Sequence, residues 1–174
     1  MASDLDRAKN ILLDGFGRID DGVGAVLDGL SIDDLLWRPD PDGNSIGWLV
    51  WHLTRQQDAQ IAHLGDTETV WSAGGWHEKL ALPYSRNAHG YGMSSADVGR
   101  FSLTDPSLLT RYQSATRDLT ARVLEQLTAQ DFDRVIDTSW DPPVTVAVRV
   151  YSVLEDAAKH LGQAEYLRGL TERK

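Results

Sequence analysis

The chain has 174 residues, a length that predicts one domain over residues 1–174, and 41% of them are hydrophobic, which is enough for a buried core. Its net charge of −9 argues against nucleic acid or an anionic membrane surface as a partner, because both are bound through lysine and arginine. The absence of cysteine excludes disulfides, thiolate metal sites and a cysteine nucleophile. No apolar run approaches the roughly 18 residues of a membrane span and no secretory signal is visible, so we expect a cytoplasmic protein, monomeric or homodimeric.

Apolar residues recur at three- and four-residue spacing in four long stretches, which is the pattern of amphipathic helices. The predicted helices cover residues 4–28, about 45–64, 105 to about 127 and about 145–171. Asn44 or Ser45 can cap the second helix and Gly65 can end it, and Asp105 followed by proline is a typical start for the third. Four helices of this length predict an all-α four-helix bundle.

The connection between the second and third helices is unusually long. Residues 66–104 contain several glycines and show no sustained period, apart from a short capped turn that we expect at residues 94–97. A connection of this length inside one domain is usually functional or disordered. His77 and His89 lie in it and could reach the mouth of a site, although loop histidines are more often solvated.

The start of the last helix is ambiguous. Residues 132–140 link it to the third helix, and valines alternate with other residues over 144–150, which alone would predict a strand. Apolar residues then continue at helical spacing to Leu170. We therefore predict one long helix over residues from about 145 to 171, and its first turns are where we expect a different structure if the prediction fails.

Three residues on two of these helices form a candidate metal site. Asp156 and His160 are four residues apart, so their side chains project from one helix face within reach of one ion. His52 lies in an apolar stretch of the second helix, and a buried imidazole there needs a polar partner from a neighbouring helix. Two nitrogens and a carboxylate suit a divalent first-row metal, zinc first, with nickel, iron or manganese as alternatives, and leave positions open for water or substrate.

Other interpretations of these residues stay open. His52 could be a structural histidine bonded to a backbone carbonyl, with Asp156 and His160 an exposed ion pair. Glu155 competes for the carboxylate role, but it lies about 140° from His160 around the helix. His63 shares nearly the same helix face as His52 but lies about 16 Å away along the axis, too far for the same ion.

Four further residues are candidates for contact with a small-molecule substrate: Trp48, Gln56, Arg149 and Gln163. Arg149 and Gln163 lie seven residues before and after Asp156, on the same stripe of the last helix. Arg149 could bind an anionic group or simply pair with a carboxylate. Gln56 follows His52 by one turn and could bond to a ligand. The six tryptophans lie mostly in or beside loops, where they could line a cavity or fill the core.

Two segments resemble signatures of the DinB-like superfamily. The sequence NSIGWLVWHL at residues 44–53 resembles its second-helix signature, and DAAKHLGQAEYLRG at residues 156–169 resembles its last-helix signature. WDPPV at residues 140–144 is similar to the segment that leads into that helix. The resemblance implies an up-down-down-up four-helix bundle with a divalent metal at one end, its ligands corresponding to His52, Asp156 and His160. Where this chain has Asp156, many members have histidine, and a mycothiol-dependent isomerase of the family has glutamate.

The resemblance also implies a class of chemistry. Characterised members include S-transferases and isomerases that use mycothiol, bacillithiol or glutathione, and a metal with open positions can lower the pKa of such a thiol. We therefore expect a metal-dependent thiol S-transferase or thiol-assisted isomerase, with a cavity lined by Trp48 and loop aromatics. A hydrolase that uses metal-bound water would need the same ligands. If the protein is not an enzyme, the alternative is a non-catalytic stress-response or ligand-binding protein with a structural metal.

Overall fold

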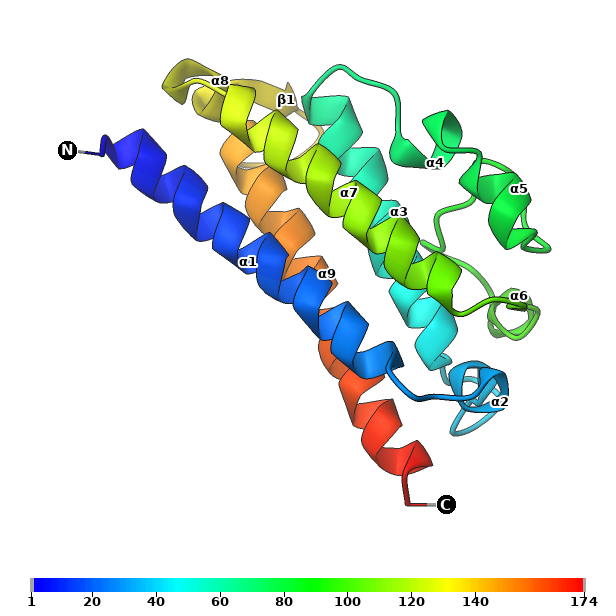
Figure 1. Ribbon diagram of the computed structural model, residues 1–174. Coiled ribbons are helices and arrows are strands. Elements are labelled where there is room, and N and C mark those ends of the chain that lie inside the picture. Colours follow the sequence, from blue (N-terminus) through cyan, green and yellow to red (C-terminus); the bar gives the residue numbers. More distant parts are fainter. Residues whose placement is uncertain (1, 174) are drawn as a thin grey trace.

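Four long helices lie side by side in the computed structural model, which describes residues 2–173 (Figure 1). They are α1 (Asp4–Leu27), α3 (Ile46–Leu64), α7 (Ser107–Gln126) and α9 (Val146–Thr171). Both α1 and α3 pack against α7 and α9, so the four enclose a common core. The all-α fold class is confirmed, and the helices begin and end within about two residues of the expected positions.

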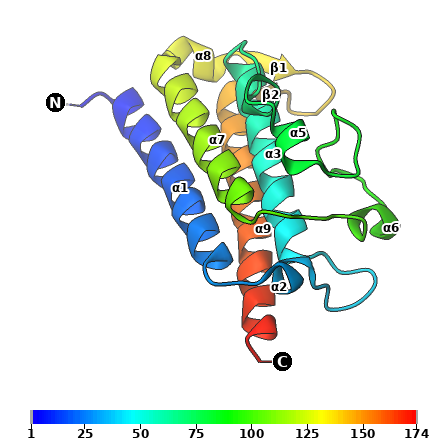
Figure 2. The ribbon, with the colours of Figure 1, turned by 45° about the vertical axis from the view of Figure 1, so that its right-hand side comes forward.

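The direction of the helices explains the long connection. Figures 1 and 2 show α3 and α7 running one way along the bundle and α1 and α9 running the other way. Because α3 and α7 are parallel neighbours, the chain must return along the bundle between them. Residues 65–106 make this crossover, and they contain α4 (Val70–Ala73), α5 (Trp76–Leu80) and α6 (Ser95–Val98).

The crossover is a packed part of the molecule. Its short helix α6 is the expected turn, with the Ser94 side chain accepting a hydrogen bond from the Asp97 N–H. The sequence did not predict α4 and α5, because helices of four or five residues are too short to show a period. Crossover side chains join the core beside α3, namely Trp71, Trp76, Leu80, Leu82, Phe101 and Leu103. Most tryptophans therefore fill the core, whereas Trp140 is 66% exposed.

The segment before α9 forms a small hairpin. Helix α8 (Ala129–Asp133) is followed by β1 (Val135–Asp137), which pairs antiparallel with β2 (Val144–Thr145). The alternating valines thus give a two-residue strand before the helix, and the Thr145 side chain caps α9 by accepting from the Val148 N–H. The hairpin loop contains Trp140, which lines a cavity together with residues of α9.

Helix α1 approaches α9 closely through two of its glycines. A Cβ on Gly15 would lie 2.7 Å from Leu154 Cδ2, and one on Gly22 would lie 2.5 Å from Leu161 Cδ2. After α1, the short helix α2 (Ile32–Leu36) leads toward α3. Within residues 2–173, none of the helices has both the length and the apolar character needed to cross a membrane.

Candidate metal centre

The packing of α3 against α9 brings His52, Asp156 and His160 together. Each residue offers one candidate ligand atom, and these atoms lie within 4.8 Å of one another. The rings of His52 and His160 meet edge to face, with centroids 4.7 Å apart. The four-residue spacing on α9 places Asp156 and His160 on one face, and the antiparallel neighbour α3 supplies the third side chain.

His52 is held in a form that can bind a metal. Its side chain is buried, and the Nδ1–H donates a hydrogen bond to the carbonyl oxygen of His89 at 2.6 Å, because a carbonyl can only accept. This leaves the lone pair of Nε2 for a ligand role. Burial lowers the pKa of His52, which favours the neutral imidazole that metals bind. The Trp48 ring stacks on the His52 ring, with centroids 4.8 Å apart.

His160 resembles His52 in that its Nδ1 is also bonded to an oxygen atom. The His160 Nδ1–H donates to Gln163 Oε1 at 3.1 Å, and Nε2 lies 3.5 Å from Asp156 Oδ1. Hydrogen bonding between the two raises the pKa of His160 and lowers the pKa of Asp156, so the carboxylate is ionised at neutral pH. Both histidines thus have Nδ1 fixed by an oxygen acceptor, which is the usual outer-shell arrangement of metal-binding histidines.

The donor set fits a divalent metal ion. Two imidazole nitrogens and one carboxylate oxygen are the ligands of many catalytic zinc sites and leave coordination positions open. The backbone bond expected of a structural His52 is present, but it uses Nδ1 and leaves Nε2 available. The competing candidates lie elsewhere: Glu155 forms an ion pair with Lys159, and His63 lines a hollow to which none of the three candidate ligands contributes.

A cavity of about 600 Å³ opens beside Asp156, which forms part of its wall. Trp140 from the hairpin and Tyr91 from the crossover contribute aromatic rings, and Tyr91 is 79% exposed. Polar groups come from Gln56, Gln60, Asp137, Arg149 and Ser152. A second hollow of about 480 Å³ shares Gln56, Gln60 and Tyr91 with the first. The candidate metal centre therefore borders a space that can hold a small molecule.

The four substrate-contact candidates lie in different places. Gln56 and Arg149 line the cavity. Arg149 donates to Gln60 Oε1 at 2.7 Å and lies 3.3 Å from Asp137 Oδ2, so it pairs with a carboxylate. Trp48 is buried against His52, and Gln163 is bonded to His160. Loop aromatics were expected at the cavity, but nothing in the sequence singled out Tyr91 among them.

Gly90 is packed against the His52 ring with a φ of +93°, and a Cβ there would lie 2.3 Å from His52 Nδ1. We predict that Gly90→Ala displaces the imidazole and weakens zinc binding by about 10-fold or more. Gly92→Ala is the matched control, because Gly92 also has a positive φ, but no atom of residues 2–173, its two chain neighbours aside, lies within 4 Å of the added Cβ. Equal zinc affinities for the two variants, measured by chelator competition, would contradict this assignment.

The fold and the site together define a helical-bundle protein with a candidate two-histidine, one-carboxylate metal centre beside a cavity. Residues 21–164 match the family model of the DinB superfamily, and the chain belongs to this superfamily. It is similar to a crystal structure described as a conserved protein from Enterococcus faecalis, with 30% identity and a TM-score of 0.89 over 95% of this chain and 97% of that chain. No significant match was found among curated proteins.

Proposed function

We propose that the protein is a divalent-metal-dependent enzyme that transfers a low-molecular-weight thiol of the mycothiol type to a small electrophile, or uses that thiol to isomerise one. The observation that carries the proposal is the position of Asp156, which belongs both to the metal-ligand cluster and to the wall of the cavity of about 600 Å³. Membership of the DinB superfamily supports it, because the resemblance implies thiol-dependent members.

His52, Asp156 and His160 would hold the cation, with zinc as the first choice. A bound divalent cation supplies positive charge and open positions, which lower the pKa of a thiol that reaches it. The thiol must belong to a co-substrate, because the chain has no cysteine. Gln163 and the His89 carbonyl hold the two imidazoles in place while their Nε2 atoms serve as ligands.

The cavity would bind the electrophile and part of the thiol compound. Exposed rings of Trp140 and Tyr91 can cover apolar or planar groups, and the amide of Gln56 can bond to polar ones. The charge of Arg149 is balanced by its ion pair with Asp137, so the guanidinium is not free to bind an anionic group of a substrate. In the transfer, the thiol gives its proton to solvent, its sulfur bonds to the electrophilic carbon, and the leaving group departs with the bonding electrons.

The test is turnover of an activated aryl chloride by the zinc-loaded protein with mycothiol, with other thiols and without thiol. We expect chloride release that requires both mycothiol and zinc, that is lost in His52→Ala, and that is retained in His63→Ala. Product formation without thiol would indicate a hydrolase. Zinc binding without turnover of any electrophile with any thiol would favour the non-catalytic alternative, and failure to bind zinc or a similar cation would remove the basis of the proposal.

A further inference from the structure

A short part of the crossover is tied to the helix that carries His52. We call residues 86–90 the strap; none of them belongs to a helix or a strand. Three of its carbonyl oxygens nevertheless accept hydrogen bonds from side chains of α3 and α4. The bonds run from Trp71 Nε1 to Arg86 at 2.9 Å, from Arg55 Nε to Ala88 at 3.2 Å and from His52 Nδ1 to His89 at 2.6 Å.

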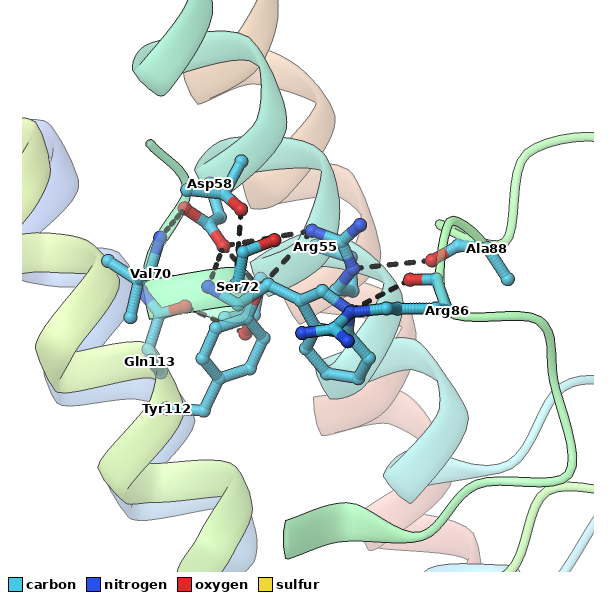
Figure 3. Close-up of polar contacts among 11 residues, drawn as sticks. Arg55, Asp58, Val70, Ser72, Arg86, Ala88, Tyr112 and Gln113 are labelled. Carbon is cyan, nitrogen blue, oxygen red and sulfur yellow. Dashed lines mark hydrogen bonds and ion pairs between the residues drawn. The ribbon is translucent and has the colours of Figure 1, made fainter. Parts of the chain in front are cut away.

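Arg55 connects the strap to a buried polar network (Figure 3). Its side chain is 6% exposed, and Nη1 lies 3.7 Å from Asp58 Oδ2. Asp58 accepts the backbone N–H groups of Val70 and Trp71, each at 2.8 Å, and the Tyr112 hydroxyl at 2.7 Å. The Arg55 guanidinium also lies 4.7 Å from the centre of the Trp71 ring. Asp58 thus holds Arg55 through the ion pair and Trp71 through its backbone N–H, and these are two of the three residues whose side chains bond to the strap.

The carbonyl bonded to His52 can orient the imidazole only if the strap itself is held. The hydrogen bond to the non-coordinating nitrogen of a ligand histidine sets its tautomer and ring orientation. In this chain that partner is a loop carbonyl, and the adjacent strap carbonyl is bonded to Arg55, three residues after His52 on α3. The face of α3 that presents the ligand is thus also the face that anchors its partner.

We propose that Arg55 and Trp71 are positioning residues of the metal centre. By holding the strap, they keep the His89 carbonyl against His52 Nδ1–H and so keep Nε2 available to the metal. This inference rests on the metal site of the proposed function, but it concerns the state of His52 before any metal binds.

The test measures the tautomer of His52 directly in the metal-free protein. Long-range proton–nitrogen NMR spectra distinguish Nδ1–H from Nε2–H imidazole, and His52→Gln identifies the signal. We expect Nδ1–H in the natural protein and a mixture of tautomers in Arg55→Lys and in Trp71→Phe, with zinc affinity lowered by about 10-fold or more. Arg55→Lys keeps a positive charge near Asp58, and Trp71→Phe keeps a ring in the core, so a folded variant should be obtained.

Tyr112→Phe is the control, because it removes a hydroxyl that donates to Asp58 and accepts from Arg55 Nη1 at 3.4 Å, while the Arg55 Nε bond to the Ala88 carbonyl of the strap stays. It should lower the melting temperature and leave the tautomer and the zinc affinity unchanged. The proposal is overturned if Arg55→Lys and Trp71→Phe fold with His52 still as Nδ1–H and with unchanged affinity, or if Tyr112→Phe changes both as much. If the natural protein binds no zinc, the proposed function fails, whereas the tautomer experiment still decides the role of the strap.

Discussion

Asp156→Ala is expected to weaken zinc binding by more than about 100-fold. Loss of an outer-shell partner of a ligand already costs about 10- to 100-fold in affinity, and this change removes a ligand and the negative charge of the cluster. Glu155→Ala is the matched control, because Glu155 is the adjacent residue on α9 and pairs with Lys159 outside the cluster. Its affinity should equal that of the natural protein.

The measurement is zinc affinity by chelator competition, together with thermal or denaturant unfolding with and without zinc. A ligand that binds the folded state alone stabilises it by about 2.7 kcal/mol at a free concentration of 100 times Kd. We expect this gain for the natural protein and for Glu155→Ala, and less than about 0.4 kcal/mol for Asp156→Ala at the same zinc concentration. A similar gain in all three proteins would show that zinc binds elsewhere.

The sequence predicted the long helices well because each repeats its apolar period over many turns. Ser45 caps α3 as expected, and Asp105 accepts the backbone N–H of Ser107 at the start of α7. The crossover at residues 65–106 has no repeated apolar period, so its structure could not be predicted in this way. Its fold comes from side chains such as Trp71 and Trp76 packing on α3 and α7, and long-range packing of this kind leaves no local period.

The candidate ligands could be predicted for two reasons, one from helix geometry and one from the cost of burying a polar group. Helical spacing fixes Asp156 relative to His160, and a histidine in an apolar helix needs a partner. The groups that orient His52 could not be predicted, because a backbone carbonyl such as that of His89 has no sequence signature. The burial of Arg55 and Asp58 could not be predicted either, because both lie in the polar run TRQQDAQ at residues 54–60, which is typical of an exposed helix face.

Asp58→Ala is expected to lower the free energy of unfolding by about 3–5 kcal/mol, because removal of one partner leaves a buried charge uncompensated. Asp58 is fully buried, and its carboxylate accepts two backbone N–H groups and the Tyr112 hydroxyl. Burial raises the pKa of Asp58, while these hydrogen bonds and Arg55 act in the opposite direction. The alanine variant leaves the Arg55 cation and three donors inside the protein without their acceptor.

Chemical denaturation of the metal-free protein measures this effect without any contribution from zinc. Asp118→Ala on α7 is the control, because Asp118 is more than half exposed and pairs with the adjacent Arg117, so its loss should change stability by no more than about 0.5 kcal/mol. Tyr112→Phe removes the hydrogen bond that the hydroxyl donates to Asp58 and the one that it accepts from Arg55, and should cost about 1–2 kcal/mol. If Asp58→Ala costs no more than Tyr112→Phe, then the Asp58 carboxylate does not stabilise Arg55, and the crossover is held on α3 by apolar packing and by the hydrogen bonds to its carbonyl groups.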